Sequence, residues 1–218
     1  MIDTCWYKDV CTVEDCKESC IRYQEVKYLM DKSGIPLLRQ FPPRLYPDGE
    51  DYSQYCLLNE QKSRIVDFVN NGENLYICST VTGNGKTTWA IKMMLKYFDE
   101  VWAGNGFRVR GVFIHTPTFL SRLKAFNEVD PDFDELKHCL PTVDLVVWDD
   151  IASSALSGYD YSQLLSYIDR RVLEGKSNIF TGNLVTYDSL EKTLGTRLTS
   201  RVWNGSRVVI FNGKDRRG

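Results

Sequence analysis

The segment between Thr80 and Thr88 carries the residue types that bind the phosphates of a nucleotide. Gly83 and Gly85 permit backbone conformations in which successive N–H groups point into one concavity at the start of a helix, where an anion is favoured. Lys86 would reach the β- and γ-phosphates, and the Thr87 hydroxyl would bind Mg²⁺. We therefore expect ATP and Mg²⁺ as cofactors, bound by Thr80, Gly83, Asn84, Gly85, Lys86, Thr87 and Thr88.

The pattern is that of the P-loop, G-x-x-x-x-G-K-[ST], except that Thr80 stands at the first glycine position. Its surroundings fit, because residues 75–79 are apolar strand formers and Trp89, Met93 and Tyr97 recur at helical spacing. The alternative is a glycine turn that happens to precede a lysine. A turn of that kind would not require a strand before it and a helix after it.

A pair of acids, Asp149 and Asp150, follows the continuous apolar run 145–148. Such a run is typical of a parallel strand that is buried on both faces. Ligands of open α/β sheets lie outside the carboxyl ends of the strands, so we expect both acids to meet the P-loop at one edge. Asp149 would hold Mg²⁺ through water, and Asp150 would polarise the attacking water. Taken alone, an acid pair would equally fit an exposed strand end.

The order of elements predicts an α/β fold. We expect strands at 75–79, 111–116, 145–148, 177–183 and 207–211, and helices at 117–126, 130–140 and 161–173. Alternating strands and helices predict a five-stranded parallel sheet between helices. The chain has 218 residues and a net charge of −2, so binding to nucleic acid would need a local patch or several subunits. Neither a membrane-length apolar stretch nor a secretory signal is evident, and we expect a cytoplasmic protein.

With these residues in place, the segments 83–87 and 144–150 together with Asn183 resemble the AAA+ ATPases. The resemblance is closest to the DnaC-type helicase loaders of bacteria and phages (IstB/DnaC-like), whose entry segment is similar to residues 33–41. It implies a P-loop fold of the ASCE class. The sequence departs from the larger AAA+ proteins in that only 35 residues follow Asn183, too few for their full helical lid, so we expect a minimal or absent lid. The resemblance also implies two parts: a Cys-rich helical partner-binding segment at 1–40 and the ATPase domain at 41–218.

The same resemblance implies roles for residues near the C-terminal end. Asn183 looks like the sensor-1 residue that orients water, and Lys86, Asp149 and Asp150 take the other catalytic roles. Residues 194–203 are similar to an arginine-finger segment, in which Arg201, or else Arg197, would reach the γ-phosphate of a neighbouring subunit in a self-oligomer. By residue type alone, both arginines would equally solvate a helix face. Arg216 could approach the nucleotide or belong to a solvated tail.

As a whole, the resemblance implies an ATPase that loads a replicative DNA helicase onto single-stranded DNA, with hydrolysis as a release switch. One alternative is an IstB-like transposition ATPase on double-stranded DNA. Another is a nucleotide-gated binding module with little hydrolysis, because Asp150 stands where most of the family carry glutamate. A small-molecule kinase fits less well, since it leaves Asn183 and Arg201 unused. The candidate DNA contacts are scattered cations: Arg108, Arg110, Arg122 and Lys124.

Four cysteines, Cys5, Cys11, Cys16 and Cys20, crowd the N-terminal part. A capping-box pattern at Thr12 predicts one helix over residues 13–32, with two of the cysteines on one face. Four thiolates could bind Zn²⁺ or an iron–sulfur cluster. The spacings match no standard zinc pattern, and four reduced thiols are the alternative.

Overall fold

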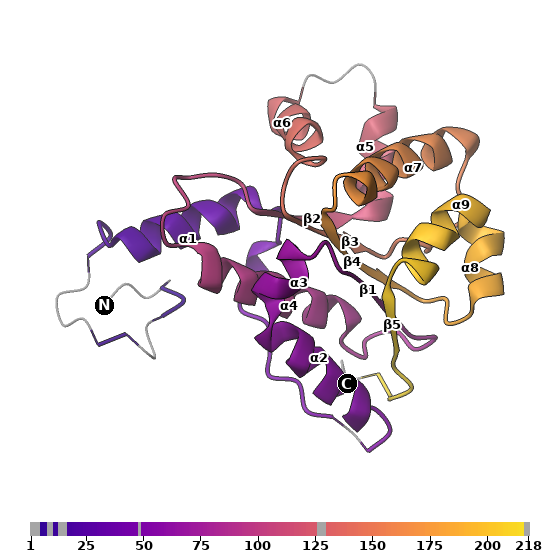
Figure 1. Cartoon of the computed structure of the whole chain (residues 1–218), viewed down its shortest axis with the longest axis horizontal. Helices are drawn as coiled ribbons and strands as arrows, with labels where there is room; N and C mark the ends of the chain where they lie inside the picture. The colour runs from indigo at the N-terminus through magenta and orange to yellow at the C-terminus, as the bar shows by residue number, and fades with distance from the viewer. Residues whose placement is uncertain (1–4, 8–10, 13–16, 48, 126–129, 216–218) are drawn as a thin grey trace.

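The computed structural model describes residues 5–7, 11–12, 17–47, 49–125 and 130–215. Five parallel strands form one sheet in the order β2-β3-β4-β1-β5 (Figure 1). Their bounds are β1 Asn74–Cys78, β2 Gly111–His115, β3 Leu145–Asp149, β4 Ser177–Gly182 and β5 Arg207–Ile210. The predicted five-stranded parallel sheet is confirmed, with β4 inserted between β1 and β3.

Helices cover both faces of this sheet (Figure 1). On one face lie α1 (Ile21–Lys32), α2 (Tyr52–Ser63), α3 (Ile65–Asn70) and α4 (Lys86–Val101). On the other lie α5 (Thr116–Lys124), α6 (Pro131–Cys139), α7 (Gly158–Leu173), α8 (Tyr187–Leu194), α9 (Thr196–Thr199) and the π-helical turn η2 (Ser200–Asn204). Alternate residues of β1 enter the two cores: Leu75 and Ile77 on the first face, Tyr76 and Cys78 on the second.

A fully buried arginine fixes α7 to the sheet. Arg171 donates from Nη1 to the carbonyls of Leu140 and Val143 at 2.7 and 2.9 Å, and from Nη2 to the carbonyl of Ser177 at 2.7 Å. Its Nε donates to Asn178 Oδ1 at 2.8 Å. Burial lowers the pKa of this guanidinium. Its donors are met by carbonyl oxygens, and the charges of Asp144 and Glu174 oppose this lowering of the pKa.

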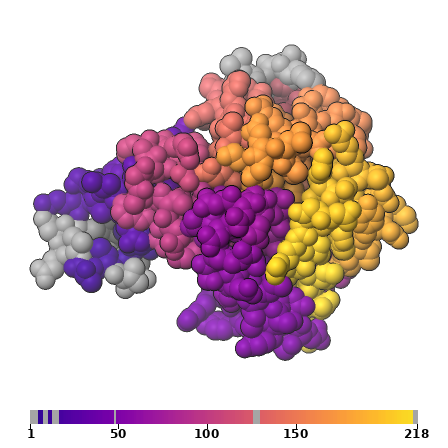
Figure 2. Space-filling model, in the orientation of Figure 1, coloured from indigo at the N-terminus to yellow at the C-terminus, as the bar shows by residue number. Residues whose placement is uncertain are grey.

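The N-terminal part differs from its prediction. Helix α1 begins at Ile21, Cys20 precedes it as the capping residue, and residues 17–20 form a turn. The predicted helix over 13–32 is therefore wrong for 17–20, and residues 13–16 lie outside the described part of the chain. Val26, Leu29 and Met30 of α1 pack in the same core as α4. In the space-filling view, the indigo N-terminal part of the chain lies against the body of the molecule (Figure 2). The division at residue 40 stays a prediction.

The segment after β4 contains short elements. Between Gly182 and Asp215 the described residues form α8, α9, η2 and β5, and no separate helical lid is among them. Across the described ranges, no helix combines the length and apolar character that crossing a bilayer requires. The 3-10 turn η1 (Leu37–Arg39) begins an irregular stretch that leads to α2.

Candidate nucleotide site

The P-loop connects β1 to α4, as the sequence predicts. Gly83 has φ +74° and Gly85 has φ +99°, in the left-handed region that glycine adopts without strain. A Cβ on Gly85 would also lie 3.1 Å from Leu45 Cδ1. Asn84 is fully buried and donates to the Ser79 hydroxyl, which accepts the Val81 N–H at 3.0 Å. The loop is thereby held in a curved conformation around an open concavity.

Lys86 lies across this loop. Its Nζ donates to the Val81 carbonyl at 2.9 Å and approaches Asn84 Oδ1 at 3.4 Å, and the residue is only 9% exposed. The ammonium group therefore lies over the concavity in which a phosphate would accept the same protons. Thr80, in contrast, is exposed and does not line the cavity.

Asp149 meets the P-loop at the carboxyl end of β3. The Thr87 hydroxyl donates to Asp149 Oδ1 at 2.7 Å, and the Thr181 hydroxyl of β4 donates to the same oxygen at 2.7 Å. Asp149 is 4% exposed. A buried carboxylate beside a threonine hydroxyl is a set of hard oxygen donors, which fits Mg²⁺. The predicted pairing of Thr87 with Asp149 is present, whereas the sequence analysis missed Thr181.

Asp150 adopts a left-handed conformation, φ +60°, which places the two neighbouring acids in different surroundings. Its N–H donates to the Thr181 hydroxyl at 3.0 Å. Asn183 Nδ2 lies 3.4 Å from Asp150 Oδ1. The structure thus brings together Asp149, Asp150 and Asn183 at one edge of the sheet, with Thr181 bonded to both acids.

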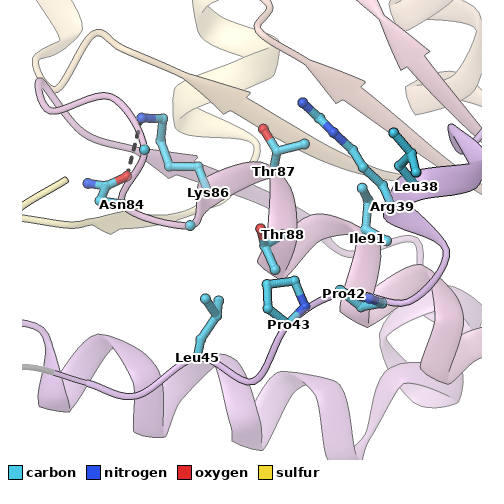
Figure 3. Close-up of a pocket in the computed structure, with 12 residues that line it drawn as sticks. Leu38, Arg39, Pro42, Pro43, Leu45, Asn84, Lys86, Thr87, Thr88 and Ile91 are labelled. Atoms are coloured by element: carbon cyan, nitrogen blue, oxygen red, sulfur yellow. Dashed lines mark hydrogen bonds between the residues drawn. The ribbon is translucent and has the colours of Figure 1, made fainter. Parts of the chain in front are cut away.

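A cavity of about 290 Å³ lies against the P-loop. Its second wall is a strap, residues 38–45, in which Pro42, Pro43 and Leu45 lie beside α4 and the loop (Figure 3). Arg39 of the strap extends along this cavity, and its Nη1 lies 3.9 Å from Asp149 Oδ2. Behind the loop, burial raises the pKa of the Cys78 thiol to about 12, although the Lys86 charge opposes the shift. Cys78 is buried, as expected.

No family model matches the chain, and no curated protein is detectably similar to it. Solved structures do match. The crystal structure of the DnaC helicase loader has a TM-score of 0.65 at 19% identity, over 78% of this chain and 94% of that one. The crystal structure of DnaI also has a TM-score of 0.65, at 16% identity over 84% and 94%. The chain has the fold of the DnaC-type helicase loaders.

A second group of matches extends this fold to replication initiators. The structure of the replication initiator DnaA bound to AMPPCP and single-stranded DNA has a TM-score of 0.58 at 15% identity, over 78% of this chain. The match covers 49% of the DnaA chain, so this protein spans about half of it. The chain therefore shares its fold with both groups of solved structures.

In this DnaC-type fold the two finger candidates lie on α9 and η2. Arg197 pairs with Asp169 Oδ2 of α7, and Arg201 Nε donates to Asp169 Oδ1 at 2.8 Å. Neither arginine lines the cavity at the P-loop. Arg216 lies outside the described residues. The structure therefore supplies no arginine finger to its own P-loop cavity from the predicted segment.

The four N-terminal cysteines are only partly described. Cys5 is buried, Cys11 is half-buried, Cys20 is exposed, and Cys16 lies outside the described residues. Within the described part of the chain, no group of three or more histidine, cysteine, aspartate or glutamate side chains could hold a metal ion. The predicted zinc or iron–sulfur site is not supported by these residues.

Proposed function

We propose that this chain is an ATP-dependent helicase loader acting in DNA replication. In this role it binds ATP with Mg²⁺, a replicative DNA helicase and single-stranded DNA, assembles with copies of itself, and uses hydrolysis as a release switch. The observation that carries the proposal is the 2.7 Å contact between Thr87 and Asp149, made beside a formed P-loop in a DnaC-type fold.

Each site residue has its own role in the proposed hydrolysis. Lys86 and the P-loop amides bind and orient the phosphates. Mg²⁺, when bound through Thr87 and Asp149, neutralises charge on the phosphate oxygens. Asp150 accepts a hydrogen bond from the attacking water, and Asn183, 3.4 Å from Asp150, fixes the position of that water. The strap restricts solvent on one side of the cavity.

Lys86→Ala tests the nucleotide part of the proposal. Removing one member of a buried charge pair costs on the order of 2–5 kcal/mol, so affinity for a fluorescent ATP analogue should fall by about a hundredfold or more. The matched control is Lys137→Ala, because Lys137 lies on α6 and pairs with Asp134 at 2.7 Å. Equal nucleotide affinity of the wild type and Lys86→Ala would contradict the assignment.

Loading of a helicase is tested by a reconstituted assay. A replicative helicase is mixed with single-stranded DNA, this protein and ATP, and unwinding of a forked substrate is followed. The wild type should increase unwinding and Lys86→Ala should not. Co-purification with a transposase and binding to double-stranded DNA would favour the IstB-like alternative instead.

A nucleotide-gated module with little hydrolysis is the second candidate. It is favoured by Asp150, which is one methylene shorter than glutamate and is held in a left-handed backbone conformation. In that case ATP binding would be tight and dependent on Lys86, while turnover would stay near background even with helicase and single-stranded DNA present.

A further inference from the structure

A second cavity, of about 550 Å³, borders the strap, and no P-loop residue lines it. Its floor is apolar, with Val26 and Met30 of α1 and Phe98 of α4. Aromatic side chains of the N-terminal segment and the strap, Trp6 and Phe41, form one wall. We call this cavity the aromatic groove. Nothing in the nucleotide site described above uses it.

Two lysines on its rim lack acidic partners. Lys62 of α2 and Lys92 of α4 lie 5.8 and 5.9 Å from the ring centre of Trp89, so the two ammonium groups face one indole. Within the described ranges, neither lysine has a carboxylate within 4.0 Å. Burial lowers the pKa of Lys92, and the charges of Lys62 and Arg44 lower it further. The one acid that lines the groove among the described residues, Asp99, pairs with Arg22 and Lys96 instead. The positive charge of Lys62 and Lys92 therefore favours an anion.

The four cations that the sequence offered as DNA contacts are each paired with an acid. Arg108 and Arg110 pair with Asp144, Arg122 pairs with Asp130, and Lys124 pairs with Asp160 at 2.7 Å. A phosphate would have to displace a carboxylate at each of these positions. The candidate DNA contacts from the sequence are therefore less suited to bind a phosphate than Lys62 and Lys92.

The aromatic wall offers ring faces beside these lysines. The Phe41 side chain is 59% exposed, and its ring lies parallel to that of Trp6 at 6.2 Å and 6°. Directly after the strap lies a further exposed aromatic, Tyr46, with the Arg44 guanidinium 6.0 Å from its ring centre. Exposed ring faces next to cations are the combination that binds single strands, because bases stack on the rings and phosphates meet the charges.

We propose that the aromatic groove binds single-stranded nucleic acid, with a base on Phe41 and the flanking phosphates on Lys62 and Lys92. The cations lie on three elements, the strap, α2 and α4, so they suit a backbone that passes along the rim rather than one compact ligand. The inference rests on the proposed function and assigns its DNA-binding surface. Pro42 lines both cavities, so a strand in the groove would contact the same strap that borders the nucleotide.

The test is anisotropy of a labelled oligothymidylate of about 12 nucleotides with the full chain, without helicase. Replacing both lysines, Lys62→Ala with Lys92→Ala, should weaken binding by at least tenfold. The slope of log affinity against log salt should fall by about 1.4, or about 0.7 for each lost phosphate contact. Phe41→Ala should weaken binding about tenfold with little change in slope, because it removes a stacking surface.

The matched control removes two charges elsewhere, by Arg122→Ala with Lys124→Ala, and should leave affinity within twofold. Equal effects of the two double variants would overturn the proposal. Preferential binding of a free mononucleotide or an acidic peptide in the groove would also overturn it. Affinity for a fluorescent ATP analogue is measured on each variant. Unchanged ATP affinity with lost DNA binding locates the effect in the groove, whereas failure of wild-type ATP binding would count against the proposed function itself.

A measurement on the wild-type protein tests the proposal even if the variants fail to fold. An oligothymidylate with 4-thiothymidine is photo-crosslinked to the unmodified protein, and the labelled peptide is mapped by mass spectrometry. Adducts at Phe41, Trp6 or the adjoining strap support the groove. Adducts confined to residues 108–124 overturn it.

Discussion

The nucleotide site and the arginine segment are two charged regions built in opposite ways. At the nucleotide site, two hydroxyls and a nearby guanidinium surround one buried acid, Asp149, and two of these donors, Thr87 and Arg39, line the cavity. In the arginine segment, Arg197 and Arg201 share one acid, Asp169, away from that cavity. Under the proposed function, one chain would carry a nucleotide-binding half of a site and a separate arginine-donating half.

The geometry also distinguishes the two arginines. Arg197 pairs with Asp169 through Nη2, whereas Arg201 donates through Nε. Within the described part of the chain, the two Nη groups of Arg201 have no hydrogen-bond partner, so they can contact a neighbour's phosphate while Nε stays bonded. Asp169 would then position Arg201 rather than compete with the phosphate. This favours Arg201 over Arg197 as the finger and leads to the following predictions.

The largest effect is expected from Arg201→Ala. An arginine finger contributes roughly a thousandfold or more to turnover, so the variant should lose that much ATPase activity in assemblies while its affinity for ATP is unchanged. Mixing it with Lys86→Ala subunits should restore part of the activity, because each variant supplies the half that the other lacks. If mixing restores no ATPase activity, or if Arg197→Ala loses more activity than Arg201→Ala, Arg201 is not the arginine finger.

The next effect tests the hydrolytic side of the nucleotide site. Asp150→Asn removes the group that accepts the proton of water, and turnover should fall by about a hundredfold with ATP affinity retained. Asp150→Glu introduces the glutamate that most members of the resembling family carry at this position. It should increase turnover relative to the wild type. Single-turnover hydrolysis of radiolabelled ATP measures both. Unchanged turnover in Asp150→Asn would instead favour the nucleotide-gated module.

A smaller effect is expected from Asp169→Asn. The carboxylate is only 12% exposed and bonds both arginines, so its loss should lower the free energy of unfolding by about 1 kcal/mol. If Asp169 positions Arg201, turnover in assemblies should fall by about tenfold while ATP affinity stays the same. Chemical denaturation and assembly-dependent ATPase assays measure the two quantities. An increase in turnover would mean that Asp169 restrains the arginines instead.

The sequence predicts those parts of the candidate site that depend on neighbouring residues in the chain. Gly83 and Gly85 predict the bend, and the apolar run before Asp149 predicts a buried strand with its acid at the ligand edge. Thr181 was missed because threonine is common in buried strands for its β propensity alone. Its hydroxyl reaches Asp149 only because β3 and β4 are adjacent in the sheet. Arg171 was missed because its acceptors come from two other segments of the chain, residues 140–143 and 177–178.

The start of α1 could not be read from local pattern either. A capping-box pattern at Thr12 predicts a helix from residue 13, yet the helix begins at Ile21. Capping contributes about 1 kcal/mol, whereas burial of Val26, Leu29 and Met30 against α4 contributes more, so packing sets where this helix begins.

The contact of Arg39 with Asp149 was missed because it depends on tertiary structure. Arg39 lies 110 residues before Asp149 in sequence, and only the path of the strap brings the two within 3.9 Å.

The smallest effect is expected from Arg39→Ala. This variant tests whether the nucleotide site needs an arginine from a neighbouring subunit. The Arg39 side chain is 53% exposed, and an exposed ion pair contributes about 0.2–1 kcal/mol. If Arg39 competes with Mg²⁺ for Asp149, Arg39→Ala should lower the Mg²⁺ concentration for half-maximal ATP binding by about two- to fivefold. Titrating Mg²⁺ against a fluorescent ATP analogue measures the shift. A loss of turnover comparable to that of Arg201→Ala would show that the strap supplies its own arginine, and the two halves would no longer need separate subunits.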